Sequence, residues 1–248
     1  MRRSMRLLGE RTCTPAIRPM KIDEVGTMPA GKSKPFRGIG MEGFIANWYA
    51  KNTAGDIEDF RRTAQMLADR LVSGAHVLEI APGPGYLAIE LARLGAYSIT
   101  GVDISKSFVR IATENARRAG LNIEFRLGDA HALPFATGSL DCIVCRAAFK
   151  NFSDPVMALR EMRRTLKPDG TALIIDMRND VSDATIDEFV RSRAGSRANA
   201  LITGWTFKHM LRKRAYNRGD MLAMAATAGF THCDITEAPI GMEVWLRP

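Results

Sequence analysis

A glycine-rich loop is the first feature of this sequence that could do chemistry. It lies in VLEIAPGPGYLAIELARLG, residues 77–95, where a short apolar run leads into a helical pattern. Gly83 and Gly85 let the backbone come close to a ligand, and the helix that follows would present its free N–H groups to it. Asp103 ends the next apolar run, 18 residues after Gly85, where a carboxylate can accept two hydrogen bonds from ribose hydroxyls. The spacing predicts a nucleoside-containing ligand.

The loop alone does not identify that nucleoside. Residues 83–88 also satisfy the dinucleotide fingerprint GxGxxA, and a plain strand-to-helix turn can give the same letters. Pro82 and Pro84 remove two N–H donors that a pyrophosphate cradle would use, which disfavours NAD. Three further features bear on the choice: Glu79 inside the strand end, Gly128-Asp129-Ala130 after a later strand, and a hairpin at the end of the chain.

Short apolar runs alternate with helical stretches between residues 56 and 177. The first helical pattern begins at Asp56, which is expected to be its cap, and ends near Gly74. Strand, helix, strand, helix repeated in this way predicts a parallel sheet with helices on both faces. The expected strands are 76–80, 98–103, 123–127, 140–145 and 172–177, and the helices between them are 86–94, 105–119 (capped by Ser105) and 154–166 (capped by Asp154).

The end of the chain breaks this alternation. A helix is expected over 217–228, closed by Gly229, and strands are expected at 233–236 and 243–246. The connection between these two strands is so short that it can only join antiparallel neighbours. The predicted fold class is therefore α/β, a doubly wound, mostly parallel seven-stranded sheet that ends in an antiparallel hairpin.

Cys142 and Cys145 form a CxxC pair, a spacing that occurs in metal and redox sites. Both lie in the expected strand 140–145, where a period of two sends residues three apart to opposite faces. The sequence has no second Cys or His pair at ligand spacing. We therefore predict that both cysteines belong to the core and that the protein has no metal site.

In this order, the motifs resemble those of the class I S-adenosylmethionine-dependent methyltransferases, above all the ubiquinone and menaquinone C-methyltransferase subgroup. The resemblance runs from about Asn47 to Pro248 and implies a Rossmann-like methyltransferase fold. VLEIAPGPG resembles motif I, and GVDIS (101–105) resembles the acidic second-strand motif. GDAHALPFATGSLDCIVC (128–145) is similar to the adenine-binding and fourth-strand region, and LREMRRTLKPDGTALIID (159–176) to the helix, turn and fifth strand.

The resemblance implies S-adenosyl-L-methionine as the cofactor, S-adenosyl-L-homocysteine as the product, and no metal. Ala81, Gly83 and Gly85 would line the methionine and ribose portions through their backbone, and Asp103 would hold the ribose. Ala81 stands where the family usually has a glycine, so a positive φ there would cost roughly 1 to 2 kcal/mol. The expected cofactor-binding residues are Tyr49, Glu79, Ala81, Gly83, Gly85, Asp103, Ile104, Asp129, Ala130 and Arg146.

The remaining cofactor assignments also follow from the resemblance. Glu79 would orient the loop or the amino group of the ligand, and Asp129 with Ala130 would hold the adenine. Asn47-Trp48-Tyr49 resembles the aromatic N-terminal helix that covers the donor, which makes Tyr49 a candidate contact. Core packing explains the two aromatic residues equally well.

Methyl transfer from a sulfonium is an in-line displacement, so the main task of such an enzyme is alignment in a dry site. A general base is needed only if the acceptor must lose a proton. The expected catalytic residues are His209, Tyr216, Arg146 and Lys150. Arg146 and Lys150 follow the fourth strand, where the family places acceptor contacts, although solvated loop charges would look the same. His209 and Tyr216 precede the last helix, and a lone His on an amphipathic helix is usually structural.

The net charge of +8 is concentrated in two segments. Residues 1–38 hold nine Lys or Arg against three Asp or Glu, and residues 191–218 hold eight basic residues and no acidic one. We predict methyl transfer to an O, N or C atom of a small-molecule acceptor. The acceptor would be anionic if the cleft is lined by Lys208, Arg212 and Lys213. The alternative is that these residues form only a solvated basic surface.

Two other functions stay open. The basic segments could be the footprint of an RNA methyltransferase, although no recognisable RNA-binding module accompanies them. The chain could also bind S-adenosylmethionine without transferring its methyl group. Nucleic acid is not expected as a partner, and a homodimer is left open.

We expect a poorly ordered basic extension at residues 1–40 and a single methyltransferase domain over 41–248. A helical, acceptor-covering insertion is expected at about 178–216. No apolar run approaches the roughly 18 residues of a membrane helix, so we expect no integral membrane association. Four cysteines in 248 residues favour a reducing compartment or indifference to redox state, and we expect a cytoplasmic protein.

Overall fold

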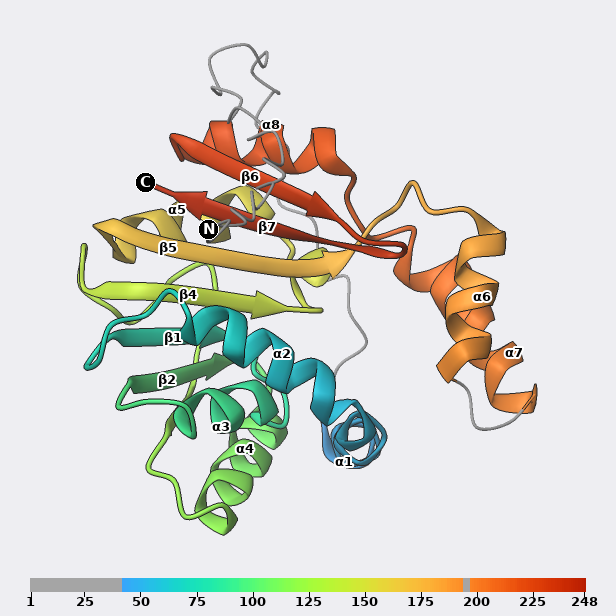
Figure 1. Ribbon diagram of the computed structural model, residues 1–248, viewed down its shortest axis with the longest axis horizontal. Coiled ribbons are helices and arrows are strands. Elements are labelled where there is room, and N and C mark those ends of the chain that lie inside the picture. Colours follow the sequence, from blue (N-terminus) through green and yellow to red (C-terminus); the bar gives the residue numbers. More distant parts are fainter. Residues whose placement is uncertain (1–41, 194–196) are drawn as a thin grey trace, which may run out of the picture.

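The computed structural model describes residues 42–193 and 197–248 (Figure 1). The extension expected at residues 1–40 lies outside the described residues. The strand bounds are β1 His76–Ile80, β2 Ser98–Asp103, β3 Glu124–Leu127, β4 Leu140–Arg146, β5 Leu166–Met177, β6 His232–Glu237 and β7 Gly241–Arg247.

These strands form one seven-stranded sheet in the order β3-β2-β1-β4-β5-β7-β6. The first five strands pair in parallel, and β7 is antiparallel to both β5 and β6. The predicted fold class is confirmed. β5 begins earlier than expected because Leu166 pairs with Leu140 before the register shifts, so that Thr171 pairs with Cys142.

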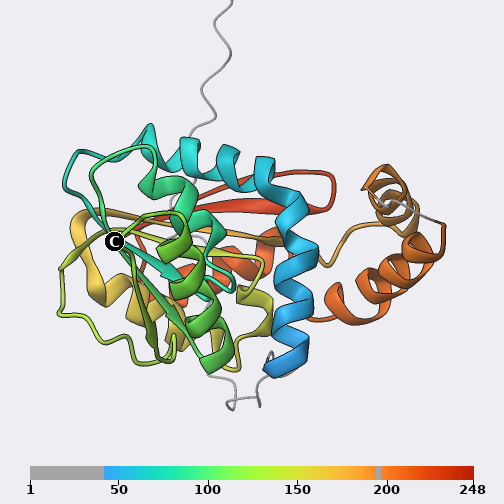
Figure 2. The ribbon, with the colours of Figure 1, turned by 90° about the horizontal axis from the view of Figure 1, so that it is seen from below.

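Helices cover both faces of the sheet, as Figures 1 and 2 show. One buried cluster contains Leu67 and Leu87 from the helices of one face, and another contains Leu159 and Met221 from the helices of the opposite face. Burial on both faces is the arrangement that parallel strands require. The helices of the first face are α2 Ile57–Ala68, α3 Tyr86–Ala92 and α4 Lys106–Arg118, and those of the second are α5 Pro155–Thr165 and α8 Arg218–Ala228.

The CxxC pair follows the predicted alternation. Cys142 packs in the cluster under α2, α3 and α4, whereas Cys145 packs in the cluster under α5 and α8. Both side chains are fully buried and free. Because they face opposite sides of the sheet, they cannot bind one metal ion together.

Side-chain caps fix the starts of two helices that the sequence predicted. The Ser105 hydroxyl accepts the Phe108 N–H at the start of α4, and the Asp154 carboxylate accepts the Met157 N–H at the start of α5. Such caps satisfy N–H groups that a helix leaves without partners. Asp56 occupies the cap position of α2, as expected, but its side chain makes no capping bond, and a short 3-10 turn, Ala54–Asp56, precedes the helix.

The expected helical insertion between β5 and α8 contains α6 Asp183–Arg193, α7 Arg197–Thr206 and a π-helical turn, Phe207–Leu211. These elements have their own small apolar cluster, which includes Ile186 and Val190. They project from the edge of the sheet in Figure 1. A further helix, α1 Gly43–Thr53, lies across the end toward which the parallel strands point (Figure 2).

Candidate functional site

The candidate site lies at the carboxyl ends of β1, β2 and β4. The chain passes from β1 outward to β2 and β3, and then returns to the other side of β1 as β4. Strand order therefore reverses at β1, and open α/β sheets bind ligands in the crevice at such a reversal. The glycine-rich loop leaves β1 at this point.

The loop after β1 makes its turn through left-handed residues. The φ angles of Ala81, Gly83 and Gly85 are 55°, 54° and 79°. A non-glycine residue in this region carries roughly 1 to 2 kcal/mol of strain, and the Ala81 N–H donates to Val102 O at 2.8 Å, which holds it there. The loop thus keeps its left-handed turn although Ala81 replaces a glycine.

The two glycines serve different purposes. A Cβ built on Gly83 would have Tyr49 Cε1 as its nearest neighbour, at 4.0 Å, so the space over this residue is open. A Cβ on Gly85 would lie 2.9 Å from the Phe125 ring and 3.0 Å from the Ala112 side chain. Gly83 is therefore the position where a ligand can approach the backbone, whereas Gly85 is required for close packing.

Asp103 ties the loop to the end of β2. Its side chain is buried, and its two oxygens accept the Gly83 N–H at 3.1 Å and the Ser105 N–H at 2.9 Å. Burial raises the pKa of this carboxyl, while the backbone N–H groups oppose the rise. Each carboxylate oxygen has a second lone pair, so Asp103 can still accept hydrogen bonds from two ribose hydroxyls.

Glu79 lies beneath the loop and is almost fully buried. Its Oε2 accepts the Ala88 N–H at 3.0 Å, in the first turn of α3. Burial raises its pKa to about 8, against the opposing effects of the Ala88 N–H and the nearby charge of Arg146. Glu79 therefore orients the loop by binding the helix that follows it, and it is mainly protonated at neutral pH.

The expected adenine-side residues lie at the ends of β2 and β3. Ile104 is 58% exposed, although it directly follows the buried Asp103. Asp129 is half-exposed, and its Oδ1 accepts the His131 N–H at 3.0 Å and lies 2.8 Å from His131 Nδ1. Ala130 is buried beside them. Ile104 and Asp129 follow neighbouring strands. An exposed apolar side chain beside a carboxylate fits a flat base that also forms hydrogen bonds.

Helix α1 covers the loop and brings Tyr49 to it. Glu42 accepts the Lys106 N–H at 3.0 Å and the Ser107 N–H at 3.1 Å, which fixes the start of α1 to the start of α4. The Tyr49 ring packs edge-on against Phe108, with ring centroids 5.8 Å apart. Burial raises the pKa of Tyr49, so its phenol keeps its proton.

The turn after β4 holds two of the expected catalytic residues in different environments. Arg146 ends β4, and its guanidinium lies 4.4 Å from the centre of the Phe60 ring. Lys150 is buried and forms an ion pair with Asp176 at 2.7 Å. Lys150 Nζ also donates to Ala147 O at 2.5 Å. Lys150 therefore stabilises the turn, and its buried ion pair leaves it poorly placed to act as a base.

Tyr216 and His209 are separated by the fold. Tyr216 packs edge-on against Phe149, which lies in the turn after β4, with ring centroids 5.9 Å apart. His209 lies in the π-helical turn, where its ring is tilted against that of the exposed Trp205, with ring centroids 5.5 Å apart. Of this pair, only Tyr216 is in contact with the turn that follows β4.

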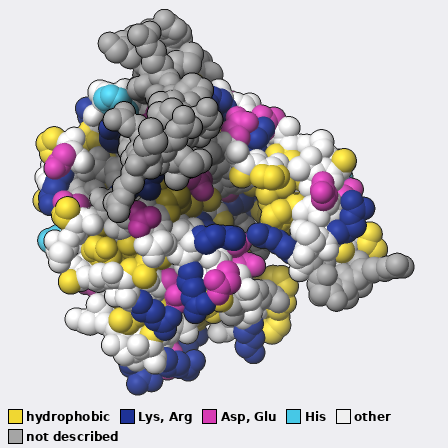
Figure 3. Space-filling view, viewed as in Figure 1, with side chains coloured by type: hydrophobic (Ala, Val, Ile, Leu, Met, Phe, Trp, Pro, Cys, Tyr) yellow, Lys and Arg dark blue, Asp and Glu magenta, His cyan; other side chains and the backbone are white. Residues whose placement is uncertain are grey.

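The basic segment 191–218 is not an unpaired positive surface. Lys208 pairs with Asp187 at 2.7 Å, and Arg212 pairs with Asp183 at 2.6 Å. These two side chains are therefore already paired, which does not support the anionic-acceptor alternative. On the face shown in Figure 3, Lys and Arg side chains lie beside Asp and Glu side chains. Two of the eight basic residues of this segment are therefore neutralised by acids of α6.

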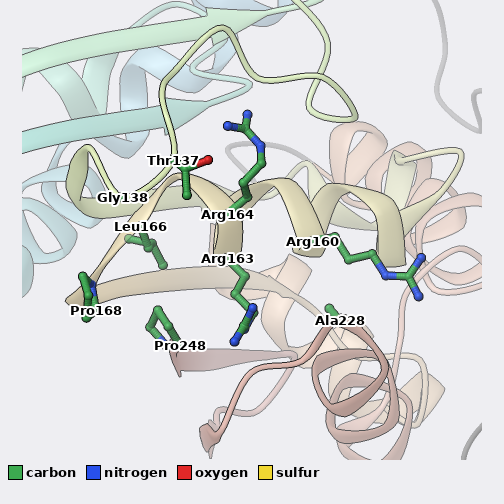
Figure 4. Close-up of a pocket in the computed structure, with 9 residues that line it drawn as sticks. All are labelled: Thr137, Gly138, Arg160, Arg163, Arg164, Leu166, Pro168, Ala228 and Pro248. Atoms are coloured by element: carbon green, nitrogen blue, oxygen red, sulfur yellow. The ribbon is translucent and has the colours of Figure 1, made fainter.

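A pocket of about 600 Å³ lies at the opposite end of the sheet, where β4 and β5 begin (Figure 4). Its three arginines point in different directions in Figure 4, so they do not converge on one anion. This pocket is remote from the loop after β1. Its lining residues are Thr137, Gly138, Arg160, Arg163, Arg164, Leu166, Pro168, Ala228 and Pro248.

Within residues 42–193 and 197–248, no helix has the length and apolar character needed to cross a membrane. The same residues contain no cluster of three His, Cys, Asp or Glu side chains suited to a metal ion.

Three residues of the site were not predicted from the sequence. Asp176 holds Lys150, Glu42 fixes α1, and Phe60 supports Arg146. Asp176 ends an apolar strand as Asp103 does, so the rule that selected Asp103 could have found it. Glu42 and Phe60 contact residues that are distant in the sequence. The residues next to them in the sequence do not indicate these contacts.

Comparison with known proteins agrees with the resemblance to methyltransferases that the sequence motifs indicate. Residues 78–174 match the family described as methyltransferase domain. The chain is 40% identical over 115 residues to uncharacterized methyltransferase YcgJ of Bacillus subtilis. The aligned region covers 46% of this chain and 45% of that protein. It is 35% identical over 111 residues to a ubiquinone/menaquinone biosynthesis C-methyltransferase of Geotalea uraniireducens, and this region covers 43% of this chain and 47% of the relative. The chain thus matches about half the length of these relatives.

The fold is found in solved structures as well. A putative S-adenosyl-L-methionine-dependent methyltransferase from Methanococcus maripaludis has a TM-score of 0.68 and 23% identity. The similarity covers 89% of this chain and 96% of that one. The fold, the ordered motifs and the family match agree. Residues 78–174 therefore match the methyltransferase domain family, and this part of the chain is similar to the ubiquinone and menaquinone C-methyltransferases.

Proposed function

We propose that the protein transfers the methyl group of S-adenosylmethionine to a small-molecule acceptor. The observation that carries this proposal is Asp103, which is buried at the end of β2 and bonded to the loop through Gly83. One carboxylate thereby fixes the loop and keeps free lone pairs for a ribose. Pro82 and Pro84 leave the loop without two N–H groups, which suits a donor that has no phosphate.

The residues of the site fit this donor. Gly83 leaves open space beneath Tyr49, Asp103 faces the same loop, and Ile104 offers an exposed apolar surface beyond it. The bound donor would supply the methyl group on a sulfonium that loses its positive charge. The chain would hold the donor, cover it with α1 and keep water away from it. Alignment of this kind supplies most of the rate of an in-line displacement.

The acceptor would enter beside the turn after β4. Tyr216 contacts Phe149 of that turn and is the expected catalytic residue best placed to contact an acceptor. The ion pairs of Lys208 and Arg212 remove support for an anionic acceptor that the sequence alone offered. An acceptor whose nucleophilic atom is already deprotonated would need no base from the protein.

The test is turnover with an unbiased mixture of acceptors. Purified protein is incubated with S-adenosylmethionine and a metabolite extract, and mass spectrometry follows S-adenosylhomocysteine and products heavier by one CH₂. We expect both to appear together, and both to be reduced with an Asp103→Ala variant when the donor concentration is low enough to leave the variant largely unbound. Binding of the donor without any S-adenosylhomocysteine would indicate a non-catalytic binding protein. Binding of NAD in its place would refute the proposal.

A further inference from the structure

His131 holds one oxygen of the Asp129 carboxylate through two contacts. Asp129 Oδ1 accepts the His131 backbone N–H at 3.0 Å, and the ring nitrogen Nδ1 of His131 lies 2.8 Å from the same oxygen. The other oxygen, Oδ2, forms no hydrogen bond or ion pair with any residue in the described part of the chain. One oxygen is therefore held, while the lone pairs of the other are available to a ligand.

A contact on the other side of the His131 ring fixes the position of its proton. The Asp154 N–H, at the start of α5, donates to His131 Nε2 at 3.2 Å. Nε2 must therefore carry a lone pair, and in the neutral ring the proton is on Nδ1. This tautomer suits Asp129, because an unprotonated Nδ1 at 2.8 Å would place its lone pair against a negative oxygen. The ring thus directs an N–H toward Asp129 Oδ1.

Aromatic packing holds the His131 ring as well. The ring lies edge-on against Phe152, with ring centroids 6.3 Å apart, and Phe152 packs against the buried Phe149 at 5.4 Å. The loop that carries the histidine is also tied to α5, because the Leu133 N–H donates to Glu161 Oε2 at 2.9 Å. A ring whose plane and proton are both fixed can orient a neighbouring carboxylate toward a ligand.

The position of Asp129 beside Asp103 indicates which ligand group its free oxygen would meet. The Gly128 N–H donates to Asp103 O at 3.0 Å, so the loop that contains Asp129 lies directly beside the end of β2. With a ribose held by Asp103, the purine of the donor would extend toward β3 and Asp129. A carboxylate only accepts hydrogen bonds, so it attracts a 6-amino group of a purine and repels a 6-oxo group.

We propose that His131 is a positioning residue that sets the selectivity of the donor site for a 6-aminopurine over a 6-oxopurine. It acts through Asp129, because holding Oδ1 turns Oδ2 toward the exocyclic group of the base. His131 itself touches neither the donor nor the reacting atoms. The proposal rests on the proposed function, since the purine belongs to S-adenosylmethionine.

The test compares two ligands that differ in this part of the base. Calorimetry measures the affinity of the full chain for S-adenosylhomocysteine, which has a 6-amino group, and for S-inosylhomocysteine, which has a 6-oxo group. The wild type should bind the amino ligand about 10- to 100-fold more tightly, because the oxo ligand loses a charge-assisted hydrogen bond and meets the carboxylate. The measurement requires no methyl acceptor.

Two variants separate the two ring contacts of His131. His131→Gln places a side-chain oxygen near the position of Nε2 and leaves no donor at the position of Nδ1. It should reduce the preference about 3- to 10-fold, the effect of one ordinary hydrogen bond. His131→Asn places its amide nitrogen near the position of Nδ1 and should keep most of the preference. The affinity for the oxo ligand should not fall in either variant, which also shows that both are folded.

A double variant shows whether His131 acts through Asp129. Asp129→Asn should itself remove most of the preference, because an amide can also donate to a 6-oxo group. Adding His131→Gln to Asp129→Asn should then cause no further change. Independent effects of the two residues would add instead.

His232 provides a matched control. Its Nδ1 lies 2.9 Å from Thr231 Oγ1 at the start of β6, which is the opposite edge of the sheet from β3. His232→Gln should keep the wild-type preference for the amino ligand. The inference is overturned if the wild type binds both ligands equally, if His131→Gln keeps the full preference or weakens both ligands equally, or if His131→Asn loses as much as His131→Gln. A wild-type protein that binds neither ligand would contradict the proposed function itself.

Discussion

Replacement of Glu79 by Gln should make the protein more stable, increasingly so as the pH rises. Glu79 is 4% exposed, and burial raises its pKa from an ordinary value of 4.5 to about 8. Between these two values the unfolded chain releases the proton while the folded chain keeps it. The folded state binds more protons there, so the free energy of unfolding falls with rising pH by up to about 1.4 kcal/mol per pH unit. The total loss approaches roughly 4 kcal/mol by pH 8, and above that pH no further loss follows.

Gln suits the comparison because it has nearly the volume of Glu and keeps an oxygen that can accept the Ala88 N–H. Urea unfolding followed by circular dichroism at pH 5, 6, 7 and 8 gives the free energy of unfolding of both proteins. The difference between Glu79→Gln and the wild type should be small at pH 5 and should grow toward pH 8. Both proteins should be measured at the same ionic strength.

An exposed carboxyl supplies the control. Hydrogen bonding to Arg117 lowers the pKa of Glu114 to about 2, so Glu114 is ionised in the folded and the unfolded chain above pH 5. Glu114→Gln should therefore differ from the wild type by an amount that does not change between pH 5 and pH 8. If Glu79→Gln gives the same pH-independent difference, or is the less stable protein at pH 8, Glu79 is ionised in the folded state and the reasoning is refuted.

Three further predictions concern neighbouring residues. Asp103→Ala should weaken S-adenosylmethionine binding about 10- to 150-fold by calorimetry, because a charge-assisted hydrogen bond contributes about 1.5 to 3 kcal/mol; unchanged affinity in a folded variant would remove Asp103 from the site. Ala81→Gly should raise the free energy of unfolding by about 0.5 to 1 kcal/mol, since the relief of left-handed strain exceeds the added freedom of the unfolded chain; a less stable variant in urea would contradict this. Lys150→Met should lower that free energy by about 3 to 5 kcal/mol, as it leaves Asp176 buried without a counter-charge, and Lys150→Met/Asp176→Asn should recover part of the loss; a change below 1 kcal/mol in the single variant would argue against the ion pair.

The sequence was informative wherever a function depends on residues close together in the chain. The loop from Ala81 to Gly85 and the carboxylate of Asp103 were found because a strand, a turn and a helix follow one another directly. The terminal hairpin was found because a short connection permits only antiparallel strands. These features reflect local chemistry, which the order of residue types expresses well.

Long-range pairing was the part that the sequence did not reveal. Residues 191–218 contain no acid, and the segment therefore looked like a positive surface. Two of its cations are neutralised by acids of α6: Asp183 pairs with Arg212, and Asp187 pairs with Lys208. A count of charges within a window cannot detect partners outside it. The same reason explains why Lys150 looked like a loop charge until the fold placed Asp176 beside it.

The buried thiols of the central sheet allow the two faces of the molecule to be observed separately. Burial raises the pKa of Cys142 to about 12, and it also raises the pKa of Cys145 above its ordinary value. Neither sulfur reacts readily with an alkylating reagent while the sheet is covered. Alkylation of Cys142 requires that α2, α3 or α4 move away, whereas alkylation of Cys145 requires α5 or α8 to do so. The rates of modification of the two thiols therefore report the local opening of each helical layer.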